Sequence, residues 1–153
     1  MDTVRDKFWI FTCVAGSDND SLKKGGFPNG SRMTPAEGAF YLGVPNLLMI
    51  RWEGLPAQPY DPYTISFTPL KQVVWSIVGS GGQTEDDELG PVLDLAGRFP
   101  NITGIYMDDF FTKDGSGRLS VDELKNVRTR LEVDGRRLDL WVVLYTKQLD
   151  LPV

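Results

Sequence analysis

The sequence predicts an α/β fold, built as a partial (half) TIM-type β/α barrel of about five parallel strands with three to four helices. Apolar segments alternate with amphipathic ones along the chain. The apolar segments carry few polar residues, which is typical of strands buried on both faces of a parallel sheet. Right-handed crossovers would then join neighbouring strands. The predicted strands are residues 8–15, 46–52, 72–78, 102–107 and 138–145.

Three segments between these strands begin with a residue that can cap a helix. Thr34 precedes Pro35 and Glu37, which together give the pattern of a capping box with proline at the first helical position. Ser120 and Glu123 repeat the spacing of a capping box. The predicted helices are residues 36–42, residues 85–99 after Thr84, and the segment that follows Ser120.

A flavodoxin-like doubly wound sheet is the alternative fold, because it suits five strands and this length. Three features favour the barrel. No helix is predicted after the last strand, the loops after the first two strands are long, and polar residues collect where strands end, which is the edge that carries barrel active sites. We therefore expect residues 1–153 to form a single α/β domain, the N-terminal portion of a longer barrel.

The composition is that of a soluble globular protein, with 41% hydrophobic and 24% charged residues. A net charge of −5 argues against a nucleic-acid partner. Apolar runs fall short of the ~18 residues that a membrane span needs. Acidic residues lie among the basic ones before the first apolar run, which makes a poor signal peptide, so the chain as given is predicted to be cytoplasmic. A secretion signal that had been removed would leave no trace.

Several kinds of chemistry are disfavoured by the residues present. The chain has no histidine, which excludes a histidine-based triad and makes a zinc site hard to build. The lone Cys13 excludes an internal disulfide. Glycine-rich residues 79–82 suggest a phosphate cradle, but the four acids at 85–88 would repel a phosphate. We expect no cofactor and no metal.

Carboxylates follow two of the predicted strands. Asp108 and Asp109 end the fourth strand, and alternation directs one of them towards the barrel axis, while the sequence leaves open which. Glu53 lies just past the second strand. Cleavage of glycosidic bonds uses two carboxyl groups about 5 to 10 Å apart. These three are the candidate catalytic residues, although a strand-end aspartate can also simply bind loop amides or face water.

Neighbouring polar and aromatic side chains could bind a substrate. Arg51 could form an ion pair with one of the acids and tune its pKa. Aromatic rings could serve as platforms for sugar rings, although most aromatic residues in such runs belong to the core. The candidate substrate-binding residues are Arg51, Trp52, Trp75, Tyr106 and Tyr145.

Residues 112–123 allow a minor alternative, a calcium-binding loop. Asp114, Gly117 and Glu123 match the third, sixth and twelfth positions of an EF-hand loop. Thr112 at the first position offers no carboxylate, however, and a strand rather than a helix is predicted before the loop. A turn followed by a helix cap accounts for the same residues without a bound calcium ion.

Four stretches, GVPNLLMIRWEG, VVWSIVGSGG, GIYMDDFF and LDLWVVLYT, carry a resemblance to a known family. Through them the chain resembles the N-terminal half of glycoside-hydrolase-like β/α barrel proteins over nearly its full length. Barrels of the α-galactosidase type place a nucleophilic aspartate at the end of strand four, where Asp108 or Asp109 stands here. The acid/base carboxylate of such barrels comes from a later strand, which this sequence does not contain.

The resemblance implies a carboxylate-based glycosidase in the intact ancestor, acting on a carbohydrate. The alternative is a non-catalytic module that binds a glycan, another small molecule or a partner chain. A half-barrel would also expose two parallel edges and an apolar face to water. We therefore expect self-association, as a homodimer or a higher homo-oligomer.

Overall fold

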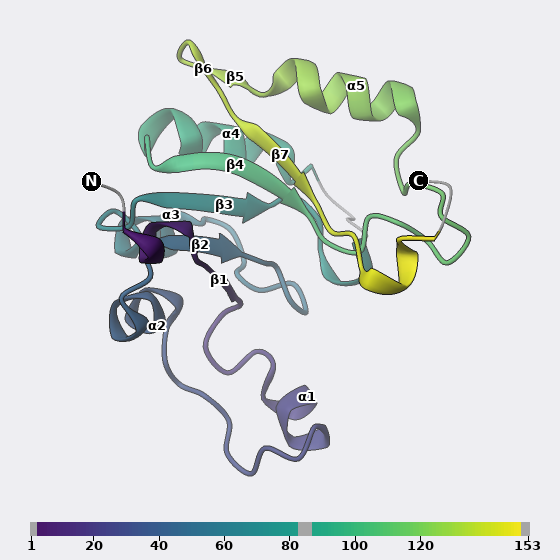
Figure 1. Ribbon diagram of the computed structural model, residues 1–153. Helices are drawn as coiled ribbons and strands as arrows, with labels where there is room; N and C mark the ends of the chain where they lie inside the picture. The colour runs from purple at the N-terminus through teal and green to yellow at the C-terminus, as the bar shows by residue number, and fades with distance from the viewer. Residues whose placement is uncertain (1–2, 83–86, 151–153) are drawn as a thin grey trace.

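The structure is a computed structural model that describes residues 3–82 and 87–150, and it confirms the α/β class. A sheet of five parallel strands lies at the centre of this described part (Figure 1). The strands are β1 (Trp9–Thr12), β2 (Asn46–Met49), β3 (Gln72–Ser76), β4 (Ile102–Met107) and β7 (Asp139–Val142).

The strands lie in the sheet in chain order, β1-β2-β3-β4-β7. A flavodoxin-like sheet would instead place its first strand between the second and the third. The order among the described strands is therefore that of consecutive strands in a β/α barrel. Every predicted strand is present, and β4 occupies the predicted residues 102–107.

Capping boxes set the start of two helices, as predicted. Thr34 Oγ1 accepts a hydrogen bond from the Glu37 amide, and Ser120 Oγ accepts one from the Glu123 amide, each at 3.3 Å. Gly43 ends the first of these helices in the left-handed conformation at φ 63°. The helices are α1 (Asn19–Lys24), α2 (Pro35–Leu42), α3 (Asp61–Ser66), α4 (Leu89–Arg98) and α5 (Val121–Arg130), with short 3₁₀ turns η1 (Val4–Lys7), η2 (Ser80–Gly82) and η3 (Thr146–Gln148).

Helix α4 begins at Leu89, later than predicted, and its predicted cap Thr84 lies outside the described residues. Each helix in the described part of the chain is too short or too polar to cross a bilayer.

The structure adds three elements that the sequence patterns do not predict. Helices α1 and α3 have six residues each, which is too short for a clear helical period. A hairpin joins β5 (Glu132–Val133) to β6 (Arg136–Arg137). Asp134 and Gly135 form its turn with φ of 49° and 71°, the two-residue geometry that an Asp-Gly pair favours.

One face of the sheet is covered by helices and holds the main core. Strand side chains alternate between the two faces, which sends Leu47, Val73 and Trp75 to this side. All three are buried. The Trp75 ring packs against Tyr60 and Phe67, with ring centroids 5.4 and 5.8 Å apart. Burying a large apolar side chain of this kind stabilises the fold by about 1.5–3 kcal/mol.

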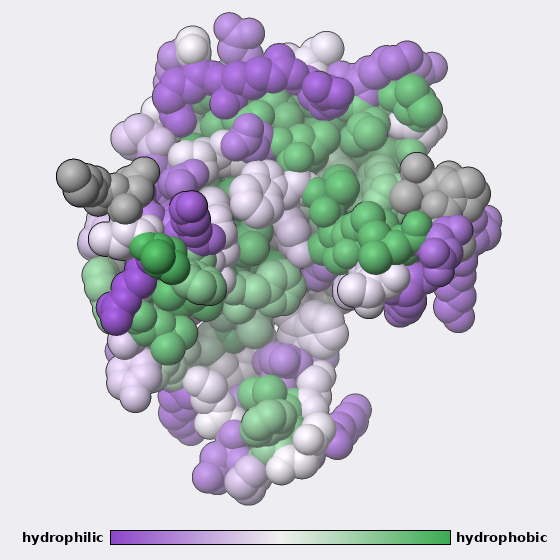
Figure 2. Space-filling view, in the orientation of Figure 1, coloured by the Kyte–Doolittle hydropathy of each residue, from purple (hydrophilic) through white to green (hydrophobic). Residues whose placement is uncertain are grey.

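The opposite face, called the open face below, is curled rather than flat. Trp9 of β1 and Trp141 of β7 lie in the two outer strands, yet their ring centroids are 4.8 Å apart. In a flat sheet these strands would be roughly 19 Å apart and their side chains would stand parallel. Gly104 permits the curl, because a Cβ there would lie 2.8 Å from the Asp139 carbonyl oxygen. Figure 2 shows hydrophobic surface over the strands in the middle of the view.

Candidate functional site at the carboxyl edge of the sheet

Four polar side chains gather where β4 and β7 end. We call Tyr106, Asp108, Asp109 and Tyr145 the Tyr–Asp cluster. Tyr106 is buried and packs on the open face with Ile50 and Val74. By the alternation of β4, Asp108 continues on the same side as Tyr106. This answers the question that the sequence leaves open, because Asp108, and not Asp109, continues the inward phase of the strand.

Hydrogen bonds link the members of the cluster. The Asp109 amide donates to Asp108 Oδ1 at 3.0 Å. The Tyr145 hydroxyl donates to Asp109 Oδ1 at 2.7 Å. The Tyr106 side chain also interacts with Asp108 and partly offsets the rise in the pKa of that carboxyl. A phenol therefore lies near each carboxylate, and the two carboxylates are joined through the backbone.

The electrostatics of the cluster raise the pKa values of Asp108 and of both phenols. Burial raises the pKa of Asp108 above its ordinary value, and the negative charge of Asp109 raises it further. The hydrogen bond to Asp109 and partial burial raise the pKa of Tyr145 to about 12. Burial also raises the pKa of Tyr106, as does the charge of Asp108. Both phenols thus remain hydrogen-bond donors at neutral pH.

Asp109 is held in an uncommon backbone conformation. Its φ is 46°, in the left-handed region that residues other than glycine rarely adopt. Arg118 holds it there by donating from Nε to the Asp109 carbonyl oxygen at 2.7 Å. Gly82 lies against the same contact, since a Cβ at this glycine would be 2.6 Å from both of those atoms. Strained residues that are held by their surroundings often occur at functional sites.

The glycine-rich run 79–82 therefore has a structural use. Gly82 makes room for Asp109 and Arg118, a role that the phosphate-cradle interpretation did not include. Arg118 and Gln148 are also missed by sequence reasoning. Gln148 is buried, donates to the Phe111 carbonyl oxygen at 3.2 Å and accepts from the Tyr145 amide at 2.9 Å. No motif marks these two residues, because their role depends on loops that meet only in the folded chain.

Two further predicted site residues, Arg51 and Glu53, follow β2. Arg51 points to the helix-covered side and forms an ion pair with the buried Glu88. Glu53 is exposed in the turn between Trp52 and Leu55, with φ 51°. Glu53 therefore lies in a surface turn, because the chain reverses between Trp52 and Leu55 shortly after β2.

The two tryptophans predicted as platforms for sugar rings lie on opposite faces of the sheet. Trp52 is half-buried and packs against Ile50, Val74 and Tyr106 on the open face, so part of its side chain is accessible near the carboxyl edge. Trp75 is 2% exposed and packs in the helix-side core. Strand alternation directs it away from the open face, so it is a core residue and we do not include it in the site.

Residues 112–123 form a turn and a helix cap. Asp114 Oδ1 accepts hydrogen bonds from the Ser116 amide at 3.2 Å and from the Ser116 hydroxyl at 2.7 Å, and it also accepts one from Thr112 Oγ1. These bonds lower the pKa of Asp114 to about 2. Glu123 closes the capping box onto Ser120. The described residues contain no group of three or more acidic or cysteine side chains placed to hold a metal ion.

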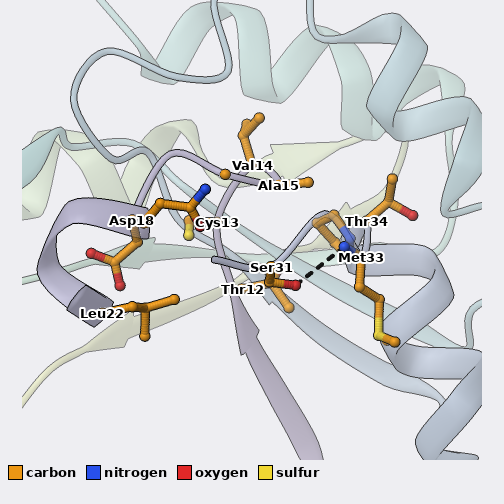
Figure 3. Close-up of a pocket in the computed structure, with 13 residues that line it drawn as sticks. Thr12, Cys13, Val14, Ala15, Asp18, Leu22, Ser31, Met33 and Thr34 are labelled. Atoms are coloured by element: carbon orange, nitrogen blue, oxygen red, sulfur yellow. Dashed lines mark hydrogen bonds between the residues drawn. The ribbon is translucent and has the colours of Figure 1, made fainter. Parts of the chain in front are cut away.

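A separate cavity of about 210 Å³ opens at the carboxyl end of β1, between the loop that carries α1 and the start of α2 (Figure 3). Cys13, Val14, Leu22, Met33 and Pro35 are among its lining residues. None of the predicted site residues lines it, so this cavity and the carboxylates are separate features.

Comparisons of the chain with protein-family models, with curated proteins and with solved structures find no significant match.

Proposed function

We propose that this chain is a glycoside-hydrolase-like β/α unit that binds a carbohydrate at the carboxyl edge of its sheet and cleaves a glycosidic bond there. One observation carries the proposal. Asp108 and Asp109 are adjacent at the end of β4, yet burial and the neighbouring charge raise the pKa of Asp108, while Asp109 is oriented by Tyr145 and Arg118. Two carboxyl groups in different environments can take the separate acid and stabilising roles that the cleavage of a glycoside uses.

In the proposed reaction Asp108 carries the transferred proton. Protonated Asp108 donates to the glycosidic oxygen as the bond from that oxygen to the anomeric carbon breaks, which releases an alcohol. The Asp109 carboxylate stabilises the positive charge that develops on the sugar ring. Water then attacks the anomeric carbon and gives its proton to ionised Asp108, which restores the starting state.

Aromatic and phenolic groups around the acids support a sugar as the ligand. Tyr106 and Tyr145 carry hydroxyl groups beside the two acids, and the Tyr145 hydroxyl donates to Asp109. The phenol oxygens can accept hydrogen bonds from sugar hydroxyls. Trp52 offers part of an indole ring near the same edge, and such rings stack on the apolar faces of sugars.

A panel of 4-nitrophenyl glycosides tests the proposal. The wild type should release nitrophenol from at least one of them, and Asp108→Asn should reduce kcat/KM by about 100-fold or more. Asp108→Glu should recover part of the activity, because it restores a proton donor. Circular dichroism checks that the variants fold. Hydrolysis that persists in Asp108→Asn would contradict the assignment of the proton donor.

A non-catalytic glycan-binding module is the second candidate function. It is favoured by Glu53, which lies in an exposed turn and not in a buried setting that would shift its proton affinity. In this case a glycan array should show binding by the wild type, no nitrophenyl glycoside should be cleaved, and Asp108→Asn should still bind the same glycans.

A further inference from the structure

Both outer strands of the sheet keep one edge unpaired among the described residues. Strand β1 pairs only with β2, and β7 pairs only with β4. All pairings are parallel, so the two free edges run in the same direction. Open edges of this kind readily accept another strand.

A groove lies beside the free edge of β7. It has a volume of about 280 Å³ and runs between α5 and β7. Leu131 and Leu138 are buried and form its floor. Its lining residues are Leu124, Arg128, Leu131, Arg137, Leu138, Asp139 and Leu140. We call it the leucine groove. In a β/α barrel this side of the sheet is covered by the ring of helices, and the free edge of the last strand pairs with the next strand.

The free edge of β1 carries the side chains that could fill such a groove. Phe8, just before β1, is 57% exposed, and Phe11 within it is 54% exposed. By alternation Phe8 points to the same side as Ile10, which packs on the helix-side core, while Phe11 points to the open face, where its ring lies 6.1 Å from that of Tyr106. Laid parallel to β7, this segment would present Phe8 to the leucine groove and Phe11 to the open face.

We propose that two copies of this chain pair side by side through the edges of their sheets. Strand β7 of each copy pairs with β1 of the other. Two-fold symmetry then satisfies both free edges at once and closes a barrel of ten strands, five from each copy. The curl of the sheet fits this arrangement, because the contact between Trp9 and Trp141 shows that both outer strands turn to the same side. Phe8 of the second copy fills the leucine groove. This inference is independent of the proposed glycosidase activity.

Sedimentation velocity of the full chain over a range of concentrations tests the pairing. The wild type should sediment as a dimer. Phe8→Lys at the β1 edge and Val142→Lys at the β7 edge should each weaken the dimer about tenfold or more, because each places a charge in an apolar interface. Both side chains are partly exposed, at 57% and 40%, so the monomers should still fold, which circular dichroism can check.

Ile65→Lys is the matched control, since Ile65 is 60% exposed and lies on α3, in the connection between the inner strands β2 and β3. It should leave the dimer unchanged. A monomeric wild type would overturn the proposal, as would a dimer that resists both edge substitutions. A dimer weakened by Phe11→Lys but not by Val142→Lys would also overturn it, since it would indicate stacking of the open faces in place of edge pairing.

Discussion

Two sets of carboxylates lie close together in the chain and are held in opposite ways. Asp114 and Glu123 are exposed, and hydrogen bonds from hydroxyls and amides lower their pKa values. Asp108 is half-buried, and its pKa is raised by burial and by Asp109. The first set stabilises a turn and a helix start, whereas the second is suited to holding a proton. Acidic residues of similar type thus become structural or potentially chemical according to the donors and the water around them.

The largest expected difference between the two sets is in activity. Asp109→Asn should reduce kcat/KM on any cleaved glycoside by about 100-fold or more, because it removes a negative charge beside the reacting carbon. Asp114→Asn, in the neighbouring loop, should leave kcat/KM within about twofold of the wild type. If both substitutions reduced kcat/KM equally, the loop would belong to the site. The proposed difference between the two sets of carboxylates would then be wrong.

Two neighbouring glycines test whether the backbone around Asp109 must be held in place. Gly81 and Gly82 share a φ of 69°, so alanine strains both positions in the same way. A Cβ at Gly81 meets open space, but a Cβ at Gly82 would lie 2.6 Å from the Asp109 carbonyl oxygen. Gly82→Ala should therefore reduce kcat/KM about tenfold more than Gly81→Ala, because small displacements of reacting groups are costly. Equal effects on kcat/KM would show that only the shared strain matters.

The capping role of the loop should appear in stability alone. Ser120→Ala removes the hydroxyl that accepts from the Glu123 amide, and the loss of an N-cap of this kind lowers the free energy of unfolding by about 1 kcal/mol. Urea denaturation measures this change in stability. The kcat/KM for glycoside hydrolysis should stay the same as in the wild type. A loss of turnover at unchanged stability would assign the loop to the site.

The smallest expected effects are in the pH dependence of stability, and they have opposite signs. The raised pKa of Asp108 means that its ionisation destabilises the folded state, increasingly as the pH rises from its ordinary 3.8 through the raised value. Asp108→Asn should thus stabilise the protein more at neutral pH than in acid. The lowered pKa of Asp114 stabilises the fold above 3.8, and this contribution is lost as the pH falls towards about 2.

Asp114→Asn should accordingly destabilise the protein at neutral pH and have little effect in strong acid. Thermal unfolding of both variants and the wild type across this pH range measures both trends. Two curves of the same sign would contradict the assigned environments.

Local sequence patterns predict much of the fold because they reflect local physics. The β-branched and aromatic run 102–107 gives β4, and the spacing of Ser120 and Glu123 gives the start of α5. Helices α1 and α3 are too short to show a period, so the sequence pattern does not reveal them. The sequence also predicts that acids end β4, but it does not fix the phase that directs Asp108 inward.

The remaining site contacts depend on residues distant in the chain. Trp75 falls in the core because β3 has the opposite phase from that needed for a platform. Arg118 reaches Asp109 across a loop, and Tyr145 reaches it from beyond β7. Such contacts leave no spacing rule in the sequence, since the intervening residues only need to return the chain to the same edge.

The contrast between the two sets of acids can be measured most directly by a titration of the side-chain carboxyl carbons of Asp108 and Asp114 by ¹³C NMR. The proposed roles predict that Asp108 titrates above the ordinary aspartate value of 3.8 and that Asp114 titrates near 2. If Asp108 titrated at or below 3.8, it would hold no extra proton at the carboxyl edge, and its proposed role as the acid would be wrong.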